Sequence, residues 1–126
     1  FPGAPVLLLT VPPVVEAQWD AFCQQEYGVD GGGRCDRLAK AYGGVVRQVA
    51  AEYGCPCVDT YAAIMARAGS LDGVGPFVTD GLHLSTEGHE VVHAAVRAAL
   101  DEVLGLPEGI PMQYPGPVNA PLGLLK

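Results

Sequence analysis

The amino-acid sequence predicts an α/β protein with a parallel β-sheet. Two short apolar runs, residues 4–10 and 55–59, are typical of buried strands, and amphipathic helical patterns lie between and after them. The resulting order of strand, helix, helix, strand, helix, helix implies right-handed crossovers and helices on both faces of the sheet. With 126 residues, 49% of them hydrophobic and 17% charged, the chain is suited to one packed domain.

The first strand is expected over Ala4–Thr10, a run bounded by prolines that should be buried on both faces of the sheet. Pro12 and Pro13 end it. Apolar residues then recur at helical spacing and predict a helix over Val14–Gln25. The residues that this helix should bury are Val15, Trp19, Phe22 and Cys23. The glycine-rich loop at 28–33 lacks the Gly-Lys-Ser/Thr of a phosphate-binding loop, which excludes that function.

A second helix is predicted over Asp36–Tyr53, with an apolar stripe that should face the core. The stripe consists of Leu38, Tyr42, Val45, Val49 and Tyr53. Gly43 and Gly44 lie in the middle of this helix, where each glycine costs roughly 1 kcal/mol unless close packing requires it. Gly54 is expected to end the helix.

The second strand is expected over Cys55–Asp59, and Asp59 should cap a helix over Thr60–Ala68. That helix should pack through Tyr61, Ile64 and Met65. A glycine-rich loop then leads to a last helix over Thr86–Leu104. The residues of this helix that should face the core are Val92, Val96, Ala99, Leu100 and Val103. Residues 106–126 are rich in proline and lack periodicity, which predicts an extended tail.

Composition excludes several classes of partner. The net charge is −7 and the seven Lys and Arg residues form no cluster, so nucleic-acid binding is not expected. The uninterrupted apolar runs, Val6–Leu9 among them, are too short to span a membrane. No signal peptide is visible, and a cytoplasmic location is favoured. The four cysteines should then be free thiols, with a Cys23–Cys35 disulfide as the alternative.

The segment Asp80-Gly81-Leu82-His83 supplies the candidate catalytic residues, Asp80 and His83. An imidazole can act as a general base, and a carboxylate can fix its tautomer and stabilise the imidazolium. A turn ahead of a helix, at the carboxyl edge of a parallel sheet, is where α/β enzymes gather reacting groups. The alternative is a purely structural turn in which His83 is a half-buried polar residue.

Several segments together resemble the GDSL/SGNH family of serine hydrolases, and most of all its isoamyl acetate-hydrolysing esterases. They are Val-Leu-Leu-Leu-Thr-Val-Pro-Pro at 6–13, Glu16 and Trp19, Val-Asp-Thr-Tyr at 58–61, Asp-Gly-Leu-His-Leu-Ser at 80–85 with Gly88, and the start of the tail. The resemblance implies a flavodoxin-like three-layer α/β/α fold and a Ser-Asp-His triad that includes Asp80 and His83. It also implies hydrolysis of small carboxylic, acetate-type esters without a metal or organic cofactor. The same family layout serves carbohydrate deacetylation.

The sequence departs from this family where the nucleophile should be. The Gly-Asp-Ser block and the oxyanion glycine and asparagine of the family have no match here. The serines are Ser70 and Ser85, and Ser85 is expected to cap the helix that follows it. Two buried strands also need neighbours that the chain does not supply. Residues 1–105 are therefore expected to form the C-terminal half of an SGNH domain whose serine lies outside this chain, and an inactive, truncated or diverged fragment is the alternative.

A second motif, His89-Glu90-Val91-Val92-His93, matches the H-E-x-x-H signature of zinc metalloproteases. A catalytic zinc needs a third protein ligand, and no histidine follows His93. Arg97 lies one turn after His93 and would repel a dication. Two solvent-facing histidines on an amphipathic helix are therefore expected and no metal ligand is assigned, with a zinc metalloprotease as the disfavoured alternative.

Overall fold

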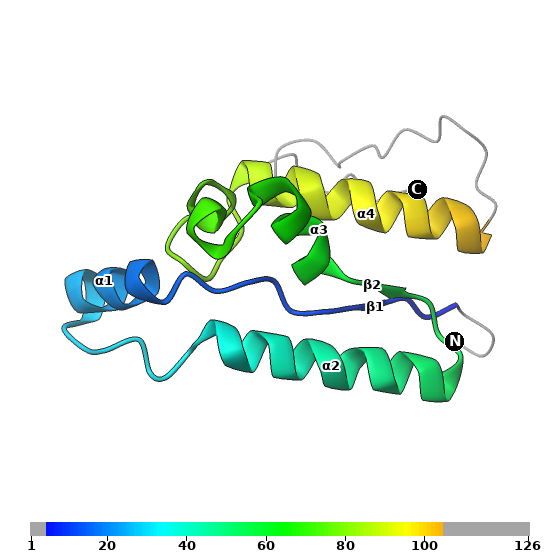
Figure 1. The fold of residues 1–126 in the computed structure, drawn as a ribbon, viewed down its shortest axis with the longest axis horizontal. Coiled ribbons are helices and arrows are strands. Elements are labelled where there is room, and N and C mark those ends of the chain that lie inside the picture. The colour runs from blue at the N-terminus through cyan, green and yellow to red at the C-terminus, as the bar shows by residue number, and fades with distance from the viewer. Residues whose placement is uncertain (1–4, 105–126) are drawn as a thin grey trace, which may run out of the picture.

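The computed structural model describes residues 5–104, and its elements follow the predicted order with one addition (Figure 1). In chain order they are β1 (Leu8–Leu9), α1 (Glu16–Tyr27), α2 (Asp36–Tyr53), β2 (Cys57–Val58), α3 (Thr60–Ala68), the 3-10 helix η1 (Leu71–Phe77) and α4 (Thr86–Leu104). The predicted bounds of α2, α3 and α4 are confirmed, and α1 begins two residues later than predicted. The tail predicted over 106–126 lies outside the described residues.

The sheet of the described part is a parallel pair, β1 and β2, in which Leu8 lies opposite Cys57 and Leu9 opposite Val58. Backbone hydrogen bonds from Leu8 N to Pro56 O and from Thr10 N to Val58 O, both 3.0 Å, join the strands. Helix α2 lies on one side of the pair, and α3 and α4 lie on the other (Figure 1). This arrangement is compatible with part of an α/β fold, whereas the flavodoxin-like three-layer arrangement stays a prediction.

The prediction of a strand over Ala4–Thr10 that is buried on both faces is wrong for the described residues. Strand β1 has only two residues, Val6 is 53% exposed and Leu9 is 42% exposed. Proline at 5 and at 12–13 limits the strand, because proline cannot donate to a ladder of hydrogen bonds. In residues 5–104 only β2 pairs with β1, so the apolar run has cover on too few sides to be buried.

The predicted buried stripe of α2 is also wrong. Tyr42, Val45, Val49 and Tyr53 are exposed, and the residues that α2 buries are Asp36, Ala39, Gly43 and Ala50. The two faces differ by one position in the sequence, or about 100° around the helix. A Cβ atom at Gly43 would lie 3.6 Å from Thr10 Cβ, so small side chains let α2 approach the strand pair closely on this face. That distance is ordinary van der Waals contact, so an alanine would also fit and close packing does not require the glycine.

The hydrophobic core lies between α3, η1 and α4. It is centred on Ile64, Val74 and Val78, and its surrounding partly buried residues are Val15, Met65, Ala68, Leu71, Phe77, Leu84, Val91 and Val92. The core-facing residues predicted for α4 are half-buried, except Val103, which is 39% exposed. Helix η1 was not predicted, because a short 3-10 helix containing Pro76 has no 3.6-residue periodicity.

A buried carboxylate joins the segment after β1 to two helices. Asp36, 4% exposed, accepts hydrogen bonds from Val14 N at 3.3 Å and from the Tyr61 hydroxyl at 3.0 Å. Its Oδ2 also lies 2.9 Å from Lys40 Nζ. These contacts hold the chain at Val14 against α2 and α3.

Candidate active site

The structure brings Asp80 and His83 into direct contact, with His83 Nδ1 lying 2.6 Å from Asp80 Oδ2. The carboxylate is buried, whereas the side chain of His83 is 68% exposed. Because Nδ1 is bound to the carboxylate, Nε2 is the ring nitrogen left to meet a further group. A fixed, buried acid beside an accessible imidazole is an arrangement in which a histidine can act as a general base.

Backbone amides fix the carboxylate of Asp80 from the other side. Leu82 N and His83 N donate to Asp80 Oδ1 at 2.9 Å and 2.8 Å. Burial acts to raise the pKa of Asp80, but the hydrogen bonds from the backbone and ring of His83 and from Leu82 N outweigh it and lower the pKa below its usual value. The carboxylate is therefore ionised at neutral pH.

The loop that carries the pair is held like a short hairpin. Val78 and Leu84 form an antiparallel bridge, Thr79 N donates to His83 O at 2.8 Å and Thr79 Oγ1 donates to the same oxygen at 3.2 Å. At the tip, Gly81 has φ of 94°, a conformation that residues with a Cβ rarely adopt. A Cβ there would lie 2.4 Å from Trp19 N. Only glycine allows this close approach to α1.

Trp19 lies near the pair, although helical spacing assigned it only a core position and the family resemblance gave it no role. Its ring meets the imidazole of His83 edge-on, with centroids 5.9 Å apart. The indole N–H donates to Gly31 O at 2.7 Å, and the guanidinium of Arg34 lies 5.4 Å from the ring centroid. Helical spacing correctly predicted that Trp19 is buried, but no signal in the sequence placed it beside His83, which is distant along the chain.

The serines of the chain do not complete a triad with this pair. The expectation that Ser85 caps α4 is confirmed, because its Oγ accepts from Gly88 N at 3.1 Å. The same hydroxyl donates to Pro76 O at 2.7 Å. Ser70 is exposed at the start of η1, and no hydrogen bond within residues 5–104 joins a serine to His83. The structure therefore leaves Nε2 of His83 without a serine from this part of the chain.

Asp59 and the four cysteines were also considered in the sequence, and Asp59 has a structural role. The predicted cap is confirmed, because Asp59 Oδ1 accepts from Ala62 N at 2.9 Å. Its other oxygen forms an ion pair with Arg47 Nη1 at 2.7 Å. All four cysteine thiols are free, and Cys23 is buried.

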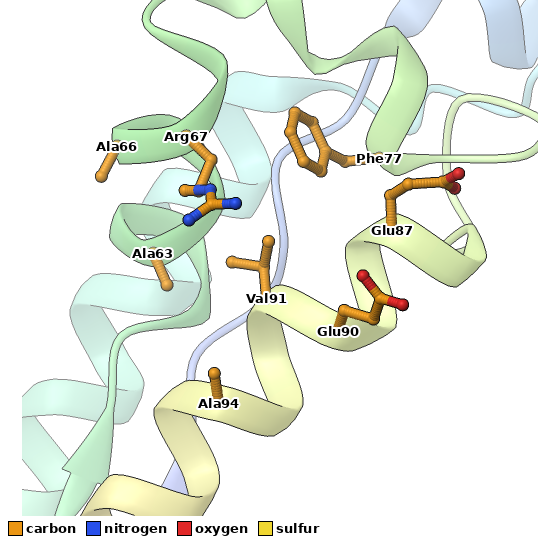
Figure 2. Close-up of a pocket in the computed structure, with 8 residues that line it drawn as sticks. All are labelled: Ala63, Ala66, Arg67, Phe77, Glu87, Glu90, Val91 and Ala94. Atoms are coloured by element: carbon orange, nitrogen blue, oxygen red, sulfur yellow. The ribbon is translucent and has the colours of Figure 1, made fainter.

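The H-E-x-x-H residues lie near the start of α4, where His89, Glu90 and His93 are all exposed. Within residues 5–104 no three His, Cys, Asp or Glu side chains gather closely enough to hold a metal ion. Glu90 instead lines a groove of about 430 Å³ between α3 and α4 (Figure 2). The side chains of Arg67 and Val91 point toward one another across it (Figure 2). None of the helices in this part of the chain is both long and apolar enough to cross a membrane.

Comparison with known proteins gives two curated relatives, whereas no family model matches the chain. A GDSL esterase/lipase of Arabidopsis thaliana is 27% identical over 113 residues, which cover 87% of this chain and 46% of the plant protein. The isoamyl acetate-hydrolyzing esterase 1 homolog of Bos taurus is 33% identical over 94 residues, which cover 72% of this chain and 34% of the bovine protein. The chain thus spans less than half the length of either relative. These matches confirm the resemblance found in the sequence and relate the chain to the GDSL/SGNH family of hydrolases.

Proposed function

We propose that this chain carries the Asp-His part of a Ser-Asp-His triad in an enzyme that hydrolyses carboxylic esters. The observation that carries the proposal is the 2.6 Å contact between His83 Nδ1 and Asp80 Oδ2, in which the acid is buried and the imidazole is exposed. The names of both relatives, an esterase/lipase and an esterase homolog, support the same class of reaction.

The roles of the two residues follow from their hydrogen bonds. With Nδ1–H donated to Asp80, the free Nε2 takes the proton of a serine hydroxyl as that oxygen attacks the ester carbonyl. The imidazolium then gives its proton to the leaving alcohol, and a water molecule repeats the cycle on the acyl-enzyme. Asp80 remains ionised throughout and stabilises the imidazolium.

The serine is proposed to come from a segment outside these 126 residues. Ser85 already uses its hydroxyl as the cap of α4 and as a donor to Pro76 O, which does not suit a nucleophile. Both relatives extend well beyond the matched region, so they have room for the Gly-Asp-Ser block of the family. On this proposal residues 1–105 form the C-terminal half of a flavodoxin-like three-layer domain, and residues 106–126 are its tail.

The proposed substrates are small carboxylic esters of the acetate type. The name of the bovine relative supports acetate esters for that protein, and we extend it to this chain as part of the proposal. The steps above require only a hydroxyl nucleophile, an imidazole and a carboxylate, so the proposed reaction uses no metal or organic cofactor.

The test is hydrolysis of 4-nitrophenyl acetate by the protein made from the complete coding sequence that contains these residues. His83→Ala removes the base and should lower kcat by several powers of ten. His93→Ala is the matched control, because His93 is also an exposed histidine, and it should change the rate by no more than a few-fold. If His83→Ala is tolerated, or if the wild-type protein hydrolyses no ester, the proposed function is wrong.

A further inference from the structure

A groove of about 400 Å³ opens beside the loop that carries Asp80 and His83. Its walls come from the chain after β1, the glycine-rich loop at 28–33, the first turns of α2 and Leu82 of the loop that carries Asp80 and His83. The apolar residues that line it are Val11, Val14, Leu38, Ala39, Tyr42 and Leu82. Arg34 is the one charged side chain among its lining residues. A largely apolar groove with few polar groups has the character of a small-molecule site.

The groove is joined to the Asp-His pair by two contacts. Leu82 lines it, and the backbone N–H of the same residue donates to Asp80 Oδ1 at 2.9 Å. Arg34 also lines it, and its guanidinium lies 5.4 Å from the centre of the Trp19 ring, whose edge meets His83. A molecule in this groove would therefore lie against the loop that holds the pair.

The groove also explains part of the exposed apolar stripe of α2. Tyr42 is 60% exposed and Leu38 is half-buried, although helical spacing predicted both to be in the core. Their side chains form one wall of the groove instead.

We propose that this groove binds the hydrocarbon part of the ester substrate, and this proposal rests on the proposed esterase function. The guanidinium of Arg34 already lies against the Trp19 ring, so the remaining lining favours an uncharged chain. Each further methylene that enters should tighten binding about fourfold, which corresponds to ~0.8 kcal/mol per buried CH₂. The groove should therefore select substrates by the length of the hydrocarbon group beyond the ester.

Binding can be measured apart from hydrolysis in the protein made from the complete coding sequence, with His83→Ala to prevent turnover. Methyl NMR follows Leu38 and Leu82 during titration with ethyl, butyl and hexyl acetate, and with the methyl esters of propanoic, pentanoic and heptanoic acid. We expect both methyl groups to shift, with affinity rising about fourfold per methylene in one of the two series. A response to the acetate series would show that the groove binds the alcohol part of the ester. A response to the methyl-ester series would show that it binds the acyl part. Shifts confined to other residues, or equal affinity along both series, would overturn the proposal.

Two exposed tyrosines of α2 give a matched pair of variants. Tyr42 lines the groove and is 60% exposed, whereas Tyr53 does not line it and is 73% exposed. In the hydrolytically active protein, Tyr42→Ala should lower kcat/KM for the longest responsive ester on the order of tenfold more than for the shortest ester. Tyr53→Ala should change neither. Equal effects of the two variants would contradict the groove as the binding site.

A third variant keeps the proposal testable if Tyr42→Ala disturbs α2. Leu38→Trp adds volume to the groove wall and should move the preferred chain length to shorter esters. An unchanged preference in a protein with wild-type thermal unfolding would overturn the proposal. The two proposals also fail differently. Loss of hydrolysis in His83→Ala without any chain-length effect in Tyr42→Ala or Leu38→Trp would retain the esterase function and reject this groove.

Discussion

The backbone N–H of Val15 donates to the carbonyl oxygen of Gly81 at 2.9 Å, which fixes the loop of the Asp-His pair against the start of α1. Gly81→Ala should break this contact, because the new Cβ would lie 2.5 Å from Val15 O in a backbone with φ of 94°. We expect a loss in the free energy of unfolding of roughly 3 kcal/mol or more, measured by urea denaturation.

Alanine variants of two other glycines distinguish the cost of atomic crowding at Gly81 from the cost of backbone strain. Gly28 has φ of 68°, but a Cβ on this residue would have no neighbouring atom within 4 Å, so Gly28→Ala should cost only about 1 kcal/mol. Gly44 lies inside α2 with open space around it, and Gly44→Ala should stabilise the protein by roughly 0.5–1 kcal/mol. If Gly81→Ala costs no more than Gly28→Ala, the close approach to α1 is not a structural requirement.

Asp80→Asn should retain the shape of the loop but remove the charge that stabilises the imidazolium and selects its tautomer. The loss in kcat for ester hydrolysis should be on the order of 10⁴ by analogy with other triads. The double variant with His83→Ala should be little worse than His83→Ala alone, because triad residues act as a unit. Asp72→Asn changes an exposed acid and serves as the control. Strictly additive losses would contradict the paired roles.

The lowered pKa of Asp80 predicts how stability depends on pH. Its pKa in the folded state lies below the unfolded value of about 3.9, so the unfolded state binds more protons in this range. The stabilisation by Asp80 is complete above the unfolded pKa and is lost as the pH falls through the folded pKa. Urea denaturation should be measured from pH 6 down to the lowest pH at which the protein folds. The free energy of unfolding should decline more steeply for the wild-type protein than for Asp80→Asn. An equal pH dependence of the two proteins would contradict the lowered pKa of Asp80.

The exposed apolar surface predicts that the 126-residue chain associates with itself. Val6 and Leu9 are exposed in the segment that contains β1, and Val45 and Val49 are exposed on α2. Apolar strand edges and large apolar patches promote association. Analytical ultracentrifugation should show a mass that grows with concentration, and Leu9→Lys with Val45→Lys should reduce it. A monomer at every concentration, with a sharp unfolding transition, would contradict this expectation.

The sequence predicted three helices to the residue because caps and breakers such as Asp59 and Gly54 mark their ends. It failed on the buried face of α2, because periodicity identifies an apolar face but not which face approaches a strand. The small residues around Gly43 allow a closer approach than the neighbouring stripe. The contact between Asp80 and His83 was predictable, because a three-residue separation in a turn is local. Trp19 and the groove depend on contacts between distant segments, which no local pattern records.

The hydrogen bond from Gln18 Nε2 to Thr79 O, 3.2 Å long, closes a loop of the chain between positions 61 residues apart. We expect this contact to form late in folding, because the entropy of closing a long loop must be lost before the contact contributes. Helices α2 and α3 can therefore be complete while the loop of the Asp-His pair is still separate from α1. During refolding, the edge contact between Trp19 and His83 should form in the last observable phase, so recovery of tryptophan fluorescence would report when the pair acquires its final geometry.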